Sequence, residues 1–253
     1  MRTIKLVVAY DGSCYYGYQK QKDYITIQSV LEELLAKLCG EPVAIAGSGR
    51  TDAGVHALAQ TVTFTTNGRI PCANLVRASR SMLPRDIVIL SAEEVAEGFH
   101  ARFSACWKTY EYKLLASRQP NPFLMRYAWQ LGVNVDELDV AAMNRAAQHL
   151  LGTNDFSAFR STGSVDSPPV KTIYEAEWRV QGEEVVFRIS GDGFLYHMVR
   201  NITWSLVQVG LGKRTEADFL AELNSERCEF LNSPAPAEGL YLAQVCYKPY
   251  PER

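Results

Sequence analysis

The stretch that decides the fold lies at residues 26–40 and reads TIQSVLEELLAKLCG. Thr26 can cap the start of a helix here, and Gly40 followed by Pro42 stops it. The apolar residues between them recur at intervals of three and four, the spacing of one helix face: Ile27, Val30, Leu31, Leu34, Leu35 and Leu38. The stretch therefore predicts an amphipathic helix.

Segments with the period of strands lie on both sides of this helix. Before it, every second residue from Ile4 to Tyr10 is apolar or aromatic, and Asp11 and Gly12 break the run. After it we predict strands over residues 43–46 and 60–66, a helix over 71–83 and a strand over 87–90. The resulting order, β-α-β-β-α-β, is that of a ferredoxin-like unit.

The second half of the chain has the same order of elements. We predict a strand over residues 109–115, a helix over 135–151, a hairpin over 173–180 and 185–189, helices over 194–211 and 216–223, and a strand over 240–247. The sequence thus predicts an α+β fold of two ferredoxin-like units, residues 1–104 and 105–253. Their strands would form one extended, mostly antiparallel sheet, with helices on one face and a cleft open to a partner.

Composition and charge narrow the class of protein. The 253 residues are 47% hydrophobic and 21% charged, which is typical of a globular chain and excludes a disordered or fibrous one. The net charge of −2 excludes a basic tail that coats nucleic acid. Residues 50–130, however, hold 10 basic and 6 acidic residues, so a polyanion can be bound locally.

Cysteine spacing and the N-terminal residues indicate the cellular setting. The six cysteines never form a C-x-x-C pair, so neither a zinc site nor a disulfide framework is indicated: Cys14, Cys39, Cys72, Cys106, Cys228 and Cys246. The first residues lack the apolar run of a signal peptide, and no apolar stretch approaches the length of a membrane span. We expect a soluble, cytoplasmic protein without a membrane partner.

The densest group of chemically useful residues is the segment GSGRTDAGVH, residues 47–56. A phosphate-binding P-loop is excluded because Val55 and His56 stand where its lysine and hydroxyl belong. A dinucleotide-binding loop is excluded because Asp52 occupies the place of its third glycine. What is left is a tight loop with a carboxylate two residues from the guanidinium of Arg50. In isolation, an aspartate in such a loop more often closes an Asx turn than it acts as a nucleophile.

Five motifs in order make the chain resemble the tRNA pseudouridine synthase A (TruA) family. The segment GRTDAGVH at residues 49–56 resembles the family signature, and DG at 11–12 with GYQ at 17–19 resembles its N-terminal motif. Ser13 and Tyr18 replace the usual Thr and Trp there. The other matches are FHARFSA at 99–105 with KTYEY at 108–112, HMVRN at 197–201 and EGLYL at 238–242.

The resemblance implies an isomerase that breaks the N1–C1′ bond of a uridine in tRNA, rotates the uracil and rejoins it through C5. It implies Asp52 as the nucleophile, Arg200 as its charged partner and Tyr110 as the ring that stacks on the uracil. Arg50 would fill the space left by the flipped nucleotide. The target would be the anticodon stem-loop, at tRNA positions 38–40, with no cofactor or metal and a homodimer as the active form.

Other side chains have weaker predicted roles. Arg102, Lys108 and Arg160 are candidates for phosphate contacts that position the tRNA in the RNA-binding cleft. The histidines lack metal-ligand spacing and are expected to be structural: His56, His100, His149 and His197.

Two alternative functions stay open from the residues alone. One is an RNA-binding module that has lost catalysis. The other is a glycoside hydrolase, which needs a second carboxylate near Asp52, and Asp192 is the candidate. The sequence does not choose between attack of Asp52 on ribose C1′ and on uracil C6.

Overall fold

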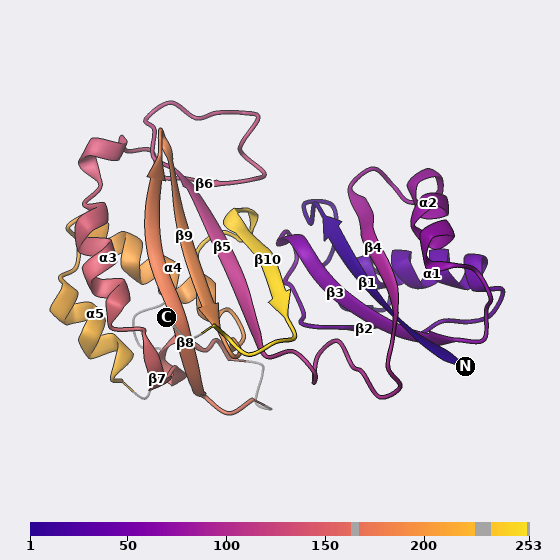
Figure 1. Cartoon of the computed structure of the whole chain (residues 1–253). Coiled ribbons are helices and arrows are strands. Elements are labelled where there is room, and N and C mark those ends of the chain that lie inside the picture. The colour runs from indigo at the N-terminus through magenta and orange to yellow at the C-terminus, as the bar shows by residue number, and fades with distance from the viewer. Residues whose placement is uncertain (163–166, 226–233, 252–253) are drawn as a thin grey trace. The chain divides into compact units, whose positions relative to one another are not determined.

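The computed structural model describes residues 1–162, 167–225 and 234–251. Contacts between residues divide these into two compact units, residues 1–106 with 241–251 and residues 107–240 (Figure 1). This differs from the predicted division between residues 104 and 105, because the last strand returns to the first unit. That strand, β10 (Leu240–Cys246), pairs in parallel with β3 (His56–Thr66).

The first unit has the predicted order of elements. These are β1 (Arg2–Tyr10), α1 (Ile27–Cys39), β2 (Ala46–Gly47), β3, α2 (Cys72–Met82) and β4 (Ile87–Val95). β1 lies between β4 and β3 and is antiparallel to both, and β2 is antiparallel to β3. Ile4, Leu6 and Val8 of β1 are fully buried, which confirms the predicted alternation.

The deciding helix is confirmed as α1. The Thr26 side chain accepts a hydrogen bond from the Ser29 backbone N–H, and Gly40 ends the helix at φ 72°, a left-handed conformation that suits glycine. The strand predicted at residues 43–46 was wrong in extent. Only Ala46 and Gly47 pair with β3, whereas Val43 and Ile45 are buried outside any strand.

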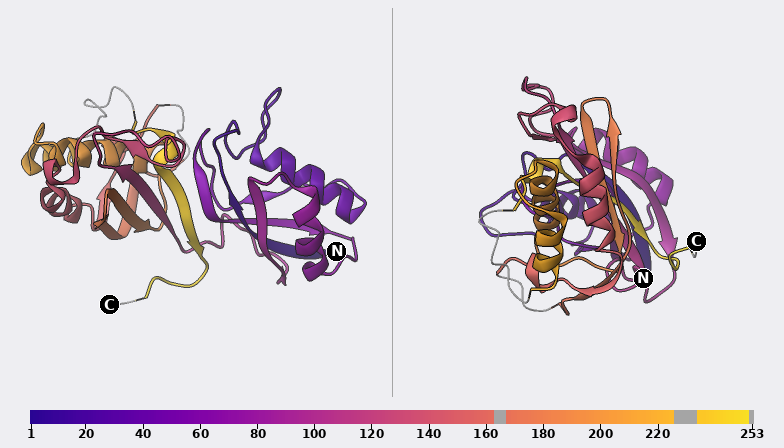
Figure 2. Two further views of the ribbon diagram at one scale, coloured as in Figure 1. Left: turned by 90° about the horizontal axis from the view of Figure 1, so that it is seen from above. Right: turned by 90° about the vertical axis from the view of Figure 1, so that its left-hand side faces the viewer.

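The second unit also combines a sheet with helices. Its elements are β5 (Trp107–Leu115), β6 (Trp129–Gln130), η1 (Val135–Glu137), α3 (Val140–Gln148), β7 (Gly152–Asp155), η2 (Ser157–Phe159), β8 (Val170–Gln181), β9 (Glu184–Gly191), α4 (Met198–Gly210), α5 (Glu216–Leu223) and η3 (Ala237–Gly239). Strands β5, β9, β8 and β7 pair in that order and are antiparallel. Helices α3, α4 and α5 group on one face of these strands (Figures 1 and 2).

Two predicted helices of this unit were too long. The run 135–151 is broken because Asn134 caps the short turn η1, after which the Asp139 carboxylate accepts from the Ala142 N–H and starts α3. The run 194–211 loses its first turn because His197 has φ 59°, a left-handed conformation that a right-handed helix cannot contain.

The described chain is therefore a mixed α/β protein whose sheets are mostly antiparallel, as predicted. No helix among the described residues is long and apolar enough to cross a membrane. The same residues contain no group of three His, Cys, Asp or Glu side chains that could hold a metal ion. Cys228 lies outside the described residues, and the other five cysteines are free thiols.

Candidate active site

Asp52 lies in the connection between β2 and β3, residues 48–55, which we call the Asp52 loop. Its first residues are anchored to β3. The Ser48 backbone N–H donates to the Thr61 carbonyl at 2.8 Å, and the Ser48 hydroxyl donates to Gln60 Oε1 at 2.6 Å. Gln60 Nε2 in turn donates to the Gly49 carbonyl at 2.9 Å. Ser48 and Gln60 are fully buried, so these bonds are shielded from water.

Thr51, directly before Asp52, is held through both its side chain and its backbone. A hydrogen bond of 2.8 Å joins Thr51 Oγ1 to the hydroxyl of Tyr10, at the end of β1. The Thr51 carbonyl accepts from the Tyr18 backbone N–H at 3.0 Å. Thr51, and with it the peptide bond that joins it to Asp52, is thus anchored twice by a segment more than 30 residues away in the chain.

The residues after Asp52 form a tight turn. The Val55 N–H donates to the Asp52 carbonyl at 3.2 Å, and Gly54 has φ 79°, which a side chain disfavours. Val55 and His56 are almost completely buried. His56 Nδ1 accepts from the Gly12 N–H at 3.1 Å, and its ring stacks on Tyr241 with 4.7 Å between centroids.

Residues 10–18, which we call the brace, press directly on the Asp52 loop. A Cβ on Gly17 would lie 2.8 Å from the Thr51 carbonyl oxygen, and one on Gly12 would lie 2.0 Å from that of Val55. Gly17 also has φ 82°. Only glycine permits this approach, which explains why the two glycines of the N-terminal motif accompany the signature loop.

Within this framework Asp52 is half-buried and Arg50 is exposed. The loop therefore presents a carboxylate and a guanidinium near solvent on a backbone that cannot shift easily. Burial raises the pKa of the Tyr10 phenol to about 12, against smaller opposing effects of hydrogen bonds from Thr51 and Gln60. Tyr10 is thus neutral at physiological pH and acts here only as a hydrogen-bonding group.

Tyr110 belongs to the second unit, on the helix-facing side of β5. It is 8% exposed, and its ring meets the ring of Phe194 edge to face with 5.1 Å between centroids. Tyr112, two residues on, is completely buried, and its hydroxyl donates to the Pro236 carbonyl at 2.7 Å. The two tyrosines therefore differ: Tyr112 is a core residue, whereas Tyr110 keeps a small accessible area.

Arg200 lies in the first turn of α4 and is half-buried. Its Nε donates to the Ala235 carbonyl at 2.6 Å, which fixes the plane of the guanidinium beside residues 235–239. Burial raises the pKa of the Tyr112 phenol, the negative charge of Glu238 adds to this, and the positive charge of Arg200 opposes it. The charge of Arg200 therefore acts on the buried hydroxyl of Tyr112.

The residues around Arg200 hold the start of α4 in place. His197 Nδ1 is 3.0 Å from the Ser161 hydroxyl, and its ring stacks on Tyr196 at 3.8 Å. The Asn201 amide donates to the Phe159 carbonyl at 2.8 Å. His197 and Asn201 of the HMVRN motif therefore connect the helix start to η2.

The predicted phosphate-binding residues lie apart. Arg102 is exposed, with its guanidinium 5.7 Å from the centre of the Phe103 ring. Lys108 is half-buried at the start of β5, opposite Gly191 of β9, and Arg160 is half-buried after η2. Asp192, the second carboxylate that a hydrolase needs, accepts from the Thr172 N–H at 3.0 Å in the second unit.

Two more predicted histidines have structural partners. His100 Nδ1 accepts from the Arg102 N–H at 3.1 Å, and His149 Nε2 is 2.8 Å from Glu216 Oε1.

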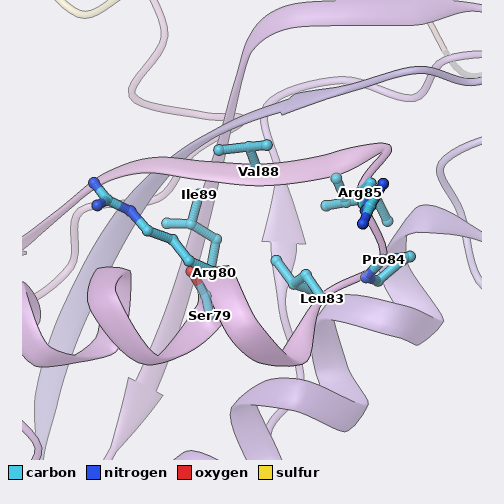
Figure 3. A pocket seen from close by; sticks show the side chains of 8 residues that line it. Ser79, Arg80, Leu83, Pro84, Arg85, Val88 and Ile89 are labelled. Atoms are coloured by element: carbon cyan, nitrogen blue, oxygen red, sulfur yellow. The ribbon is translucent and has the colours of Figure 1, made fainter.

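A pocket of about 210 Å³ lies elsewhere in the first unit, between α2 and β4 (Figure 3). Arg80 and Arg85 line it together with apolar side chains such as Leu83 and Ile89. It contains none of the predicted site residues. It shows only that basic side chains of the segment 50–130 are not confined to the Asp52 loop.

The structure thus brings Asp52 and Arg50 together on one loop, and it groups Arg200 with Tyr112 and residues 235–239. Sequence reasoning missed Tyr10 and Thr51 as the support of Asp52. The alternation along β1 placed Tyr10 inward, but nothing local indicated that its hydroxyl reaches residue 51. It also missed the Arg200–Ala235 bond, since the partner is a backbone carbonyl.

Comparison with known proteins defines the class of this chain. A family model described as tRNA pseudouridine synthase matches residues 6–104 and 146–248. A solved structure, "Crystal Structure of a Cbf5-Nop10-Gar1 Complex", aligns with 79% of this chain and with 44% of the chain in that structure. Its sequence identity is 10% and its TM-score 0.34, so it is too distant to describe this fold. The family match by itself makes the chain a pseudouridine synthase, an isomerase.

Curated relatives specify the family further. Proteins called tRNA pseudouridine synthase A are 43% identical over 247 residues in Acetivibrio thermocellus and 42% identical over 248 residues in an Exiguobacterium species. A third, from Lacticaseibacillus casei, is 41% identical over 250 residues. Each alignment covers 98% of this chain and at least 99% of the relative. The chain therefore belongs to the tRNA pseudouridine synthase A family, as its motifs predicted.

Proposed function

We propose that this chain converts uridine to pseudouridine in the anticodon arm of tRNA with Asp52 as the nucleophile. Membership of the tRNA pseudouridine synthase A family supports the isomerisation of uridine in tRNA. The observation that supports the role of Asp52 is the support of its loop on both sides, by Tyr10 and Tyr18 at Thr51 and by Gly12 at His56. A nucleophile gains most from being held in one place before the substrate arrives.

The reaction needs no oxidant, reductant or water. The N1–C1′ bond of uridine breaks and a C1′–C5 bond forms, C5 loses its hydrogen as a proton, and N1 takes up a proton. A carboxylate is suited to such covalent catalysis because it can add to the substrate and leave again. Attack on ribose C1′ and attack on uracil C6 both agree with a half-buried carboxylate.

The uridine has to leave its stack to reach a carboxylate at this depth, at a cost of a few kcal/mol. We assign to Tyr110 the stacking on the flipped uracil, which is worth about 1–3 kcal/mol. Its small accessible area and its fixed contact with Phe194 support this role. Arg50, exposed on the Asp52 loop, is suited to occupy the vacated place in the tRNA.

We assign to Arg200 the role of the positively charged partner of the Asp52 carboxylate. Its guanidinium is fixed through Nε, so the positive charge keeps the same orientation in every turnover. Asp52 and Arg200 belong to different units, so this pairing is a proposal. We assign to Arg102 and Lys108 contacts with phosphates of the tRNA backbone. Such contacts position the tRNA but do not select the base.

The remaining expectations extend this proposal. Two ferredoxin-like units are supported by the strand order β4–β1–β3–β2 in the first and β5–β9–β8 in the second. The extended sheet with its RNA-binding cleft, the homodimer and the cytoplasmic location stay predictions. Sedimentation of the free chain and of its tRNA complex measures the homodimer directly.

Release of tritium from tRNA labelled at uracil C5 tests the proposal, since the isomerisation must lose that hydrogen. We expect Asp52→Asn to lower the rate of release by at least about 10³-fold while tRNA binding is kept. Asp192→Asn is the matched control, because Asp192 is exposed and is the carboxylate that the hydrolase alternative requires. Full activity of Asp52→Asn, or a comparable loss in Asp192→Asn, would overturn the assignment.

A further inference from the structure

The register between β1 and β3 shifts by one residue just before Tyr10. Val8 pairs with Gln60 of β3, but Tyr10 pairs with Ala57, so two steps along β1 correspond to three along β3. The extra residue lies in β3, between Ala57 and Gln60, and such a bulge bends the strand that contains it. Opposite this bulge the hydroxyl of Tyr10 meets Thr51 Oγ1 at 2.8 Å.

The Tyr10–Thr51 bond has the surroundings of a strong hydrogen bond. Tyr10 is 5% exposed and Thr51 is 7% exposed, so water competes little for either hydroxyl. Of the two hydrogen bonds described for Thr51, this one joins side-chain atoms at both ends. The other, from the Tyr18 N–H to the Thr51 carbonyl, is backbone to backbone.

We propose that the Tyr10 hydroxyl is a positioning group for catalysis, which orients Asp52 through Thr51. The inference rests on the proposed role of Asp52 and adds a residue to it. Tyr10 does not touch the substrate. It fixes the rotamer of Thr51 and thereby the plane of the peptide from which the Asp52 side chain projects.

The neighbouring Tyr18 provides a matched comparison. It belongs to the same brace and is 3% exposed, but its hydroxyl is buried without a hydrogen-bond partner among the described residues. Burial raises the pKa of this phenol above its ordinary value. Removal of this hydroxyl should leave Thr51 where it is, because Tyr18 holds Thr51 through its backbone N–H.

The test is steady-state tritium release with Tyr10→Phe, Thr51→Val, the double variant, Thr51→Ser and Tyr18→Phe. We expect about tenfold lower kcat for each of the first two, with KM for tRNA changed less than twofold, since misplacement affects the reacting geometry and not binding. The double variant should lose no more than Tyr10→Phe alone, because Tyr10→Phe already removes the bond that Thr51→Val removes. Thr51→Ser keeps a hydroxyl and should retain near wild-type kcat, as should Tyr18→Phe.

Hydrogen exchange of the amides of residues 51–53 gives a second readout that does not depend on chemistry. Tyr10→Phe should raise their exchange rates, and Tyr18→Phe should not. Any of four outcomes overturns the proposal. Two concern single variants: an unchanged kcat in Tyr10→Phe, or a loss in Tyr18→Phe equal to that in Tyr10→Phe. The others are a multiplicative loss in the double variant, and failure of both Tyr10→Phe and Thr51→Val to fold. An active Asp52→Asn variant instead refutes the nucleophile, whatever Tyr10→Phe does.

Discussion

The Asp52 loop and the start of α4 hold their charged residues in different ways. The described hydrogen bonds that anchor the Asp52 loop act on Ser48, Gly49 and Thr51, and on His56 directly after the loop. Arg200 is anchored through its own side chain, whose Nε donates to the Ala235 carbonyl. The backbone that carries the carboxylate thus depends on packing around the loop, whereas the guanidinium is also held by a hydrogen bond of its own side chain.

The largest effect is expected where packing holds the loop, at Gly17. Gly17→Ala places a Cβ 2.8 Å from the Thr51 carbonyl oxygen at φ 82°, and both the clash and the strain act on the peptide beside Asp52. We expect a loss of about 3 kcal/mol in the free energy of unfolding, measured in urea, and loss of activity.

Gly182→Ala is the matched control for Gly17→Ala. Gly182 has φ 67°, but nothing lies within 4 Å of the added Cβ. Only the strain of about 1–2 kcal/mol applies there. Equal costs for the two variants would show that the brace does not press on the loop.

Arg200→Lys tests the other side of the comparison. Lysine keeps the charge but has no Nε–H for the Ala235 carbonyl and no planar fork. We expect kcat to fall about 100-fold and the free energy of unfolding to fall by about 1 kcal/mol, because the carbonyl of the buried Ala235 loses this donor. Arg179→Lys, at an exposed ion pair with Glu177 at 2.8 Å, should change neither quantity. Full activity of Arg200→Lys would mean that charge alone suffices.

Tyr112→Phe addresses the segment that carries the partner of Arg200. The Tyr112 hydroxyl donates to the Pro236 carbonyl, next to Ala235, so its removal deprives a part-buried acceptor of this donor. We expect a loss of about 2 kcal/mol in the free energy of unfolding and a kcat lower by a small factor. A variant as stable as wild type would show that Pro236 has another donor.

The smallest effect is expected in the pH dependence of stability. The folded-state pKa of Tyr10 is about 12 against the ordinary 10.0, so the folded state keeps this proton where the unfolded state has released it. The free energy of unfolding therefore falls as the pH rises from 10 to 12. Between pH 8 and pH 11, the free energy of unfolding of Tyr10→Phe should fall by about 1 kcal/mol less than that of the wild type. Parallel pH profiles would contradict a buried phenol at residue 10.

Local patterns predicted the elements whose causes are local. The helix confirmed as α1 has its cap at Thr26 and its stop at Gly40 within 15 residues. The predicted helix over 216–223 has the bounds of α5, which Thr215 caps. The helix over 135–151 was wrong because apolar spacing continued through Asp139, whose side chain begins a new helix instead of continuing the old one.

Short motifs in the sequence identified the family and nominated Asp52, Tyr110 and Arg200, because such motifs can be compared letter by letter. The tertiary structure decided what supports two of them: the Tyr10 hydroxyl at Thr51 and the Ala235 carbonyl at Arg200. Each of these contacts joins residues 35 to 41 positions apart. A contact over that separation leaves no local pattern, since only the folded chain brings its two ends within hydrogen-bond distance.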